Sequence, residues 1–317
     1  MRDLSVIIPA RCEMFLKRTI EDILENMEAD TEIIAICDGN WPEPSVQDHS
    51  RVTIVHHTES IGQRAATNEG ARISQAKFVM KADAHFAFDK GFDAKLMADC
   101  EKDWTIIPWL RKLHAFDWKC KNCGNQTYQS DLPIQCEKCQ HQEFEMVTIW
   151  KPKKGGTYSW RFDNALNFQY WRKHSKRPEW ENKDLIETMS FIGACFLMHR
   201  ERFLELGGCD EAHGSWGNYG TEIALKAWLS GGKLIASRKT WAGHFFRTGN
   251  MKKHRGGSCF PYPLSGKAQE YAKQYSRDFW FNNRLPNQKH NLAWIVNRFW
   301  PVKGWTEKDK AQLGEIW

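Results

Sequence analysis

Long apolar stretches are missing from this 317-residue sequence. It contains no run of about 18 uncharged apolar residues, which is the length that a helix needs to cross a bilayer. The chain also passes from Met1 directly into a strand-like segment, without the apolar core of a signal peptide. We therefore expect a soluble, cytoplasmic protein that does not bind a membrane.

A strong excess of one charge is also missing. The net charge of +6 is modest for the length, so it permits an anionic partner without requiring one. The sequence has no internal repeat and no low-complexity tract. A single α/β domain with an insertion is the expectation for a chain of this size.

Closely spaced cysteines are few, because six of the ten are isolated in the sequence. The other four are Cys120, Cys123, Cys136 and Cys139, which form a C-x₂-C-x₁₂-C-x₂-C pattern. Four thiolates at this spacing suit tetrahedral Zn²⁺, and the metal would hold together a segment too small for its own core. We predict a structural zinc ribbon. Many ribbons contact nucleic acid, but many others are only structural.

Strands alternate with helices along the first third of the chain. Apolar runs at residues 4–10, 32–37, 52–56 and 77–81 predict strands, and residues 15–26 and 63–76 predict helices between them. This order favours a mostly parallel sheet that binds ligands at the carboxyl ends of its strands. Asp38 and Asp83 both follow such ends.

The strand and helix pattern stops after residue 107 and resumes with a strand at residues 190–199, a helix at 221–230 and a strand at 233–237. We therefore place an insertion at residues 111–187. In the first part, Asp83 and His85 lie two residues apart in an extended segment, so both can face one ion. A carboxylate with an imidazole suits Mn²⁺ better than Mg²⁺.

This order of motifs resembles the GT-A glycosyltransferases, and polypeptide N-acetylgalactosaminyltransferases most closely. The resemblance rests on Asp38, on the helix that begins at Gly62-Gln63-Arg64, and on Asp83-Ala84-His85. It covers residues 4–88 and 190–247. It implies a GT-A fold with a mostly parallel, Rossmann-like central sheet and an inserted zinc ribbon.

The resemblance also assigns a role to each part of the chain. Residues 1–110 would be the nucleotide-sugar-binding half, 188–260 the acceptor and catalytic half, and 261–317 a helical extension. The donor would be a UDP-sugar, whose diphosphate gains charge as the glycosidic bond breaks and needs a cation beside it.

The resemblance implies a donor site with a Mn²⁺ or Mg²⁺ ion. A distant His-x-Phe-Arg motif completes the metal site in the resembled enzymes, and His244-Phe245-Phe246-Arg247 stands in that place. The metal ligands would then be Asp83, His85 and His244. The candidate nucleotide-binding residues are Pro9, Arg11, Asp38, Gly62, Arg64, Asp83, Arg247 and His254. Alternatives stay open: a plain turn at Asp38, a surface ion pair for Arg64, and a solvated basic loop after His244.

A second cluster, residues 207–223, resembles the acceptor side of GT-A enzymes. In inverting members a carboxylate at the start of this helix is the general base. Glu222 is the first candidate for that role, with Asp210 as a second acid and Trp216 beside them. The motifs of retaining and inverting relatives both differ from this sequence here, so the stereochemistry stays open. Asp210 is equally a helix cap.

The insertion suggests the acceptor. Residues 151–177 contain eight Lys and Arg against one acid, interleaved with aromatic residues, as in nucleic-acid grooves. Core packing and sugar stacking are the alternatives. The first hypothesis is a hydroxymethylcytosine in phage DNA, modified in the host cytoplasm and flipped out of the duplex. The others are a protein Ser/Thr or polysaccharide acceptor, and a non-catalytic zinc protein that binds nucleic acid.

Overall fold

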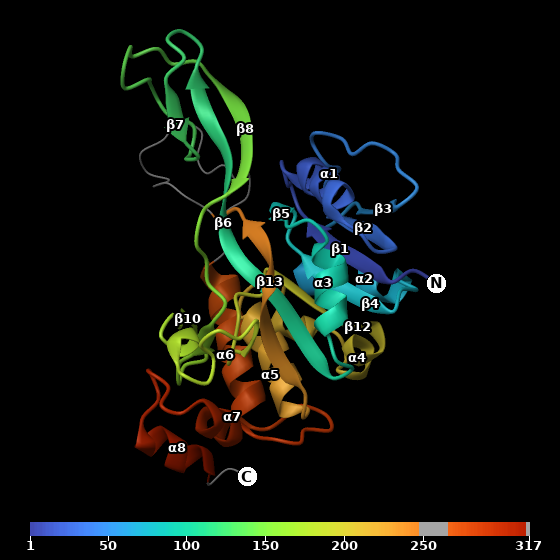
Figure 1. The fold of residues 1–317 in the computed structure, drawn as a ribbon, viewed down its shortest axis with the longest axis vertical. Coiled ribbons are helices and arrows are strands. Elements are labelled where there is room, and N and C mark those ends of the chain that lie inside the picture. Colours follow the sequence, from blue (N-terminus) through green and yellow to red (C-terminus); the bar gives the residue numbers. More distant parts are fainter. Residues whose placement is uncertain (247–265, 315–317) are drawn as a thin grey trace.

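The computed structural model describes residues 1–246 and 266–314, and an eleven-stranded mixed sheet forms its centre (Figure 1). The strand order is β11-β13-β6-β12-β4-β1-β2-β3, with β5 beside β13 and with β7 and β8 beside β6. The first five strands are β1 (Leu4–Ala10), β2 (Thr31–Asp38), β3 (Val52–His57), β4 (Phe78–Ala82) and β5 (Phe86–Phe88). The others in this sheet are β6 (Trp104–Cys120), β7 (Gln126–Tyr128), β8 (Phe144–Pro152), β11 (Leu185–Glu187), β12 (Cys195–His199) and β13 (Lys233–His244).

The predicted parallel sheet is confirmed in the amino-terminal half. Strands β3, β2, β1 and β4 are parallel neighbours, so their carboxyl ends share one edge. Strand β12 lies antiparallel between β4 and β6, and β13 runs parallel to β6. The fold class is therefore α/β with a mostly parallel core, as the sequence indicated.

Two crossover helices, α1 (Leu16–Asn26) and α2 (Gln63–Ile73), belong to this parallel half. Leu16, Ile20 and Ile23 of α1 recur at helical spacing and are buried, while Arg18 on the outer side pairs with Glu25. Each such buried side chain contributes about 2 kcal/mol. Helix α2 packs closely on β1, because a Cβ at Gly70 would lie 2.5 Å from the Ile7 side chain.

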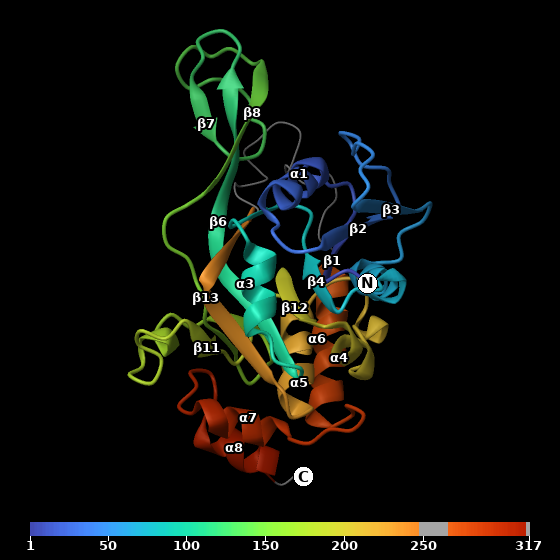
Figure 2. The ribbon, with the colours of Figure 1, turned by 45° about the vertical axis from the view of Figure 1, so that its right-hand side comes forward.

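The carboxyl-terminal half is held by a buried helix, α5 (Tyr219–Leu229), all of whose residues are buried. Its burial follows from cover on two sides, since it contacts β6 and β13 on one side and α7 (Leu292–Phe299) on the other. Trp228 of α5 packs edge-on against Phe299. The remaining helices are α3 (Phe92–Asp99), α4 (Arg200–Glu205), α6 (Gly266–Phe281) and α8 (Glu307–Gly314). Figure 2 shows α5 and α6 side by side, with α7 and α8 at their ends.

The insertion does not form one unit. Strand β6 runs for 17 residues without a break and crosses the expected boundary at residue 110. Its far end forms the ribbon with β7 and β8, which projects from one end of the molecule (Figure 1). After β8 the chain returns to the main body, where β9 (Trp160–Phe162) and β10 (Phe168–Tyr170) form a hairpin. Trp160 and Phe162 are part of the main core. Only the ribbon is therefore separate.

None of the helices in the described ranges is long and apolar enough to span a membrane.

Candidate active site

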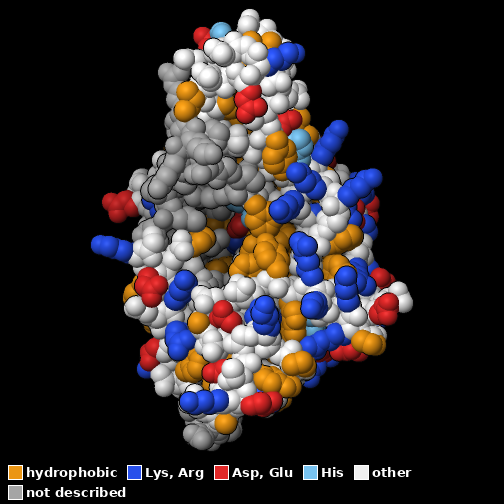
Figure 3. All heavy atoms as spheres, turned by 90° about the vertical axis from the view of Figure 1, so that its left-hand side faces the viewer, with side chains coloured by type: hydrophobic (Ala, Val, Ile, Leu, Met, Phe, Trp, Pro, Cys, Tyr) orange, Lys and Arg blue, Asp and Glu red, His pale blue; other side chains and the backbone are white. Residues whose placement is uncertain are grey.

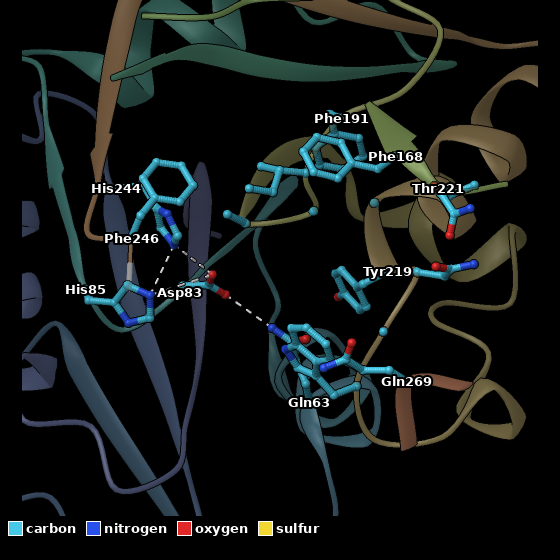
Figure 4. Close-up of a pocket in the computed structure, with 18 of the residues that line it drawn as sticks. Gln63, Asp83, His85, Phe168, Phe191, Tyr219, Thr221, His244, Phe246 and Gln269 are labelled. Carbon is cyan, nitrogen blue, oxygen red and sulfur yellow. Dashed lines mark hydrogen bonds and ion pairs between the residues drawn. The ribbon is translucent and has the colours of Figure 1, made fainter. Parts of the chain in front are cut away.

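Three predicted metal ligands meet at the edge where the parallel strands end. Asp83 directly follows β4, His85 directly precedes β5, and His244 is the last residue of β13. The antiparallel pairing of β13 with β5 sets His244 opposite Phe86, next to His85. Figure 4 shows the three side chains turned toward one another. The sheet thus joins two sequence motifs that are about half the chain apart.

The distances within this group suit one ion. His244 Nε2 lies 3.2 Å from Asp83 Oδ2 and 3.1 Å from His85 Nε2. Two donor atoms that each lie about 2.1 Å from an ion, at a right angle, are about 3 Å apart. His85 Nε2 and Asp83 Oδ2 are 4.0 Å apart, which corresponds to a wider angle at the same ion. The donor set therefore fits a divalent cation of the Mn²⁺ or Mg²⁺ type.

Neighbouring groups fix the orientation of the ligands. Glu13 Oε2 lies 3.1 Å from His85 Nδ1, which leaves Nε2 to face the ion, as second partners of metal-binding histidines do. Lys81 forms an ion pair with Asp83 Oδ1, and Gln63 Nε2 donates to the same oxygen over 3.2 Å. Asp83 thus has Oδ2 available for a metal.

The protonation states of Asp83 and His244 match metal binding, whereas burial acts to lower the pKa of His85 but Glu13 and Asp83 outweigh it and raise the pKa. Burial acts to raise the pKa of Asp83, but Lys81 and the two imidazoles outweigh it and hold the pKa well below its usual range. Burial lowers the pKa of His244 to about 4, so its imidazole is neutral near pH 7. An ionised carboxylate and a neutral imidazole are the forms that bind a cation.

A pocket of about 460 Å³ opens beside these ligands. Its walls come from segments that are distant in sequence: the start of α2, the β4–β5 turn, the β9–β10 hairpin, the loop before β12, the start of α5, the end of β13 and α6. Apolar side chains include Phe168, Phe191 and Phe246, and Figure 3 shows a hollow with hydrophobic atoms on this face. The metal ligands form one side of a space that can hold a sugar.

Four of the predicted nucleotide-binding residues, Pro9, Arg11, Asp38 and Gly62, do not line this pocket. Asp38 is buried and accepts hydrogen bonds from Ser60 Oγ and from the backbone N–H groups of Ile61 and Gly62. It therefore holds the loop that begins α2. Pro9 belongs to β1 and Arg11 follows it, at the same edge of the sheet.

Arg64 and Glu222 pair with each other and do not line the pocket. They form a buried ion pair, with 2.7 Å between Arg64 Nε and Glu222 Oε2. Arg64 also donates to the carbonyls of Gly214 and Gly217, and Glu222 Oε1 accepts the N–H of Asp210. Neither side chain lines the pocket, and Glu222 is fully buried. A general base must contact the acceptor hydroxyl, so this position contradicts that role for Glu222.

Asp210 is a cap, and Trp216 lines the pocket. Asp210 caps the short 3₁₀ helix η2 (Glu211–His213) through Ala212 N–H, and it contacts His213 Nδ1. Burial acts to raise the pKa of Asp210, but His213 outweighs it and lowers the pKa to about 2. The alternative of a helix cap is the one observed. Trp216 is partly exposed at the pocket wall. The other two candidates, Arg247 and His254, lie outside the described residues.

Several pocket residues were missed by the sequence motifs. Gln63, Glu13, Tyr219, Gln269 and Lys273 all line the pocket. Gln63 and Tyr219 lie inside the recognised motifs, in Gly62-Gln63-Arg64 and in residues 207–223, but neither was assigned a role. Gln269 and Lys273 lie on α6, which carries no motif. Only the tertiary packing of α6 against the Gly217 segment brings them here.

The four paired cysteines form a second candidate metal site, at the tip of the ribbon. Cys120 Sγ lies 3.6 Å from Cys139 Sγ, Cys123 Sγ lies 3.6 Å from Cys136 Sγ, and all four sulfurs are within 4.8 Å of one another. Sulfurs bound at about 2.3 Å to a tetrahedral ion are about 3.8 Å apart. The geometry therefore fits Zn²⁺.

The basic and aromatic segment supplies core residues more than a stacking surface. Trp160, Phe162 and Trp171 are buried, and Arg161 donates to the backbone at Lys303. The expectation that rings of this segment are available to nucleic-acid bases is therefore wrong for these three, whereas Tyr170 is 49% exposed. Exposed basic side chains remain at Lys151, Lys153, Lys154, Arg172, Lys173 and Lys176. Figure 3 shows Lys and Arg side chains gathered beside the hollow.

The fold is that of the GT-A glycosyltransferases. The chain superposes on a solved structure described as GalNAc-T7 with UDP, GalNAc and Mn²⁺, with a TM-score of 0.62 and 17% identity. The match covers 99% of this chain and 54% of that one. Residues 5–118 match the family model described as Glycosyl transferase family 2.

The similar curated proteins are polypeptide N-acetylgalactosaminyltransferases. Polypeptide N-acetylgalactosaminyltransferase 6 of Mus musculus is 23% identical over 332 residues, which cover 94% of this chain and 49% of the relative. Polypeptide N-acetylgalactosaminyltransferase 8 of Drosophila melanogaster is 32% identical over 229 residues, which cover 70% of this chain and 33% of the relative. The chain thus spans about a third to a half of the length of these relatives.

Proposed function

We propose that the chain is a metal-dependent glycosyltransferase that moves a sugar from a UDP-sugar to a hydroxyl group. The observation that carries this proposal is the convergence of Asp83, His85 and His244 on one wall of the pocket. The similar GalNAc-T7 structure was solved with both UDP and Mn²⁺. The catalytic activity, the donor and the cation of this chain are inferred from that combination.

The side chains around the site would prepare it for a diphosphate leaving group. A bound divalent cation would supply charge stabilisation as the glycosidic bond breaks. Glu13 orients His85, and Lys81 leaves Asp83 Oδ2 free for the cation. Phe168, Phe191 and Phe246 exclude water from the sugar, which strengthens electrostatic interactions in the pocket. Asp83 and Glu13 are the carboxylates among the described lining residues, and both already serve the metal site.

For the acceptor, we propose hydroxymethylcytosine in DNA. The support is the set of exposed basic side chains in residues 151–176, a segment whose Asn167 and Phe168 line the pocket. Such side chains attract the phosphate backbone without reading its sequence. The target base would have to leave the duplex to reach the pocket. The reaction would then take place where the DNA is, in the cytoplasm of a host cell.

A Ser or Thr hydroxyl of a polypeptide is the second candidate. It is favoured by the relatives, which are named polypeptide N-acetylgalactosaminyltransferases. A peptide does not need the basic residues of the 151–176 segment, so the two candidates differ in how they respond to neutralising that charge.

An acceptor panel distinguishes the two candidates. We would measure nucleotide release with Mn²⁺ and UDP-sugars in the presence of hydroxymethylcytosine DNA, unmodified DNA or a Ser/Thr-rich peptide. Stimulation by the hydroxymethylated DNA alone supports the first candidate, and stimulation by the peptide alone supports the second and rejects the first.

Charge variants make the panel sharper. The triple variant Arg172→Gln, Lys173→Gln, Lys176→Gln should weaken DNA binding and reduce the slope of log K against log salt by about 0.9 for each phosphate contact that is lost. The matched control is Arg72→Gln with Lys77→Gln and Lys102→Gln, three exposed residues at the opposite edge of the sheet. An equal effect of both sets would reject the segment as the acceptor surface.

A further inference from the structure

The first turn of α5 forms the pocket wall that faces the metal ligands. Figure 4 places Thr221 on the opposite side of the pocket from Asp83, His85 and His244. The first backbone N–H groups of a helix have no acceptor within it and carry partial positive charge. Asn218, the residue before α5, does not cap them with its side chain. The start of this helix is therefore rich in donors.

Two side chains add unsatisfied polar atoms to the same wall. Thr221 is 1% exposed, and its hydroxyl has no hydrogen-bond partner among the described residues. Asn218 Nδ2 is buried and also lacks a partner in the described part of the chain. Both residues line the pocket. Leaving a buried polar group without a partner is costly, so these atoms indicate a ligand with acceptor oxygens.

A lysine from α6 supplies a full charge to the pocket. Lys273 is half-buried, lines the pocket, and forms no ion pair with a carboxylate in residues 1–246 or 266–314. Its neighbour Ala272 packs on the segment before α5, since a Cβ at Gly217 would lie 3.0 Å from Ala272 Cβ. In contrast, Lys81 beside the metal site is already paired with Asp83. Among the described residues that line the pocket, Lys273 is thus the lysine with an unpaired charge.

The wall is also held in place before any ligand binds. A Cβ at Gly220 would lie 2.1 Å from the Phe191 carbonyl oxygen, so the first turn of α5 is pressed against the Phe191–Gly193 loop. Donors fixed in this way do not have to be ordered when a ligand arrives. Ammonium, hydroxyl, amide and helix N–H groups in one pocket match a carboxylate or a phosphate.

We propose that Asn218, Thr221 and Lys273 form a subsite for a carboxylate or phosphate group of the substrate, separate from the metal that holds the diphosphate. This inference rests on the proposed glycosyltransferase function and extends it to substrate choice. The anionic group belongs either to the transferred sugar, as in a uronic acid, or to the acceptor, as in a phosphate next to the reacting nucleoside.

Matched pairs of substrates test this subsite. The donor pair is UDP-glucose and UDP-glucuronic acid. For both donors we would measure nucleotide release without an acceptor, and calorimetric binding in the presence of Mn²⁺. The acceptor pair is hydroxymethyldeoxycytidine and a short oligonucleotide that contains it. The variants are Lys273→Gln and Thr221→Val, and the control is Lys267→Gln, an exposed lysine of α6 outside the pocket.

The expected result is a selective loss. Lys273→Gln should raise the KM or Kd for the anionic member of one pair by about 10- to 100-fold. This change corresponds to the free energy of a hydrogen bond to a charged group. The neutral member and UDP itself should change little, Thr221→Val should give a smaller selective loss, and Lys267→Gln none. Loss in the donor pair assigns the anion to the sugar, and loss in the acceptor pair assigns it to the acceptor.

Two results would overturn the subsite. One is an unchanged preference within both pairs. The other is weaker binding of UDP itself to Lys273→Gln, which would assign the lysine to the diphosphate. If the wild-type chain releases nucleotide from no donor, the proposed enzymatic function fails instead. Binding of UDP-glucuronic acid and of the oligonucleotide to the wild type and to Lys273→Gln would still decide the subsite in that case.

Discussion

At the scale of single residues, two ion pairs at the pocket differ in burial. Asp83, paired with Lys81, lines the pocket and turns Oδ2 toward His244 Nε2, while Arg64 with Glu222 is sealed between α2 and α5. Both pairs join residues of opposite charge, but burial differs, since the Asp83 side chain is 22% exposed and the Glu222 side chain 0%. That difference separates a metal ligand from a structural ion.

Replacing Glu222 tests the structural role of its ion pair. Glu222→Gln leaves the Arg64 charge without its buried partner, so the free energy of unfolding should fall by about 3–5 kcal/mol. Urea unfolding measures the loss, and Glu201→Gln at an exposed position is the control. A double variant, Arg64→Leu with Glu222→Leu, should recover part of the stability. If Glu222→Gln kept full stability and lost all activity, Glu222 would instead be the general base.

The sequence could predict the metal ligands but not these partners. Asp83 and His85 are neighbours in one motif, and His244 belongs to a second motif with a known place after a strand. Arg64 and Glu222 are 158 residues apart, and nothing local shows that they meet. Glu13 likewise reaches His85 across 72 residues. Long-range pairing of polar residues is set by packing, which a single sequence does not contain.

At the scale of elements, short strands bounded by turns were predictable and long ones were not. The apolar runs at β1, β2, β3 and β4 gave their positions to within about a residue or two. The full length of strand β6 was not predicted, because its half beyond residue 110 is polar and aromatic and is stabilised by pairing with β8. The Trp160–Phe162 strand was not predicted, because its basic neighbours indicated a solvent-exposed segment. Packing against the main core buries it instead.

Zinc removal should affect the ribbon and not the main body. The four cysteines hold the far end of the ribbon, while buried residues at its base such as Phe116 and Trp150 pack with Phe15 and Phe245 of the main body. We expect one Zn²⁺ per chain by elemental analysis. Cys136→Ser should lose that zinc and become protease-sensitive within residues 120–144, while Cys12→Ser, outside the cluster, should keep it. Full zinc content in Cys136→Ser would contradict the four-cysteine site.

Acid should destabilise the segment around His174, which packs on α7. His174 is buried in the 3₁₀ helix η1 (His174–Lys176), and burial lowers its pKa to about 4. The folded state therefore binds fewer protons than the unfolded state between pH 6.5 and 4. Stability is present above this window and is lost as the pH falls through it, by roughly 3 kcal/mol in all.

Urea unfolding at pH 7 and pH 4.5 measures this effect. His174→Gln cannot be protonated, so its stability should fall less between the two pH values than that of the wild type. His49→Gln, at an exposed position, is the matched control. An equal decrease in the wild type and in His174→Gln would show that His174 does not carry the pH dependence.

At the scale of the whole molecule, the pocket exists only in the assembled fold. The parallel half supplies Gln63 and Asp83, the returning insertion supplies Phe168, the second half supplies Tyr219 and the start of α5, and the C-terminal extension supplies α6. The GT-A class was predictable because its motifs lie at strand ends. The shape of the pocket was not, since hairpin β9–β10 and helix α6 carry no motif that places them there.

The most direct test of the metal-dependent transferase is nucleotide release from UDP-sugars with and without Mn²⁺, for the wild type and for Asp83→Asn. We predict release that requires Mn²⁺, stops on chelation and falls by at least about 100-fold in Asp83→Asn, because the variant loses the anionic ligand of the cation. His49→Ala should retain full activity. Asp83→Asn also removes the ion-pair partner of buried Lys81, so its unfolding curve is measured alongside to show that the variant is folded at the assay temperature. Release that is equally fast in Asp83→Asn, or that does not depend on a divalent cation, would contradict the account.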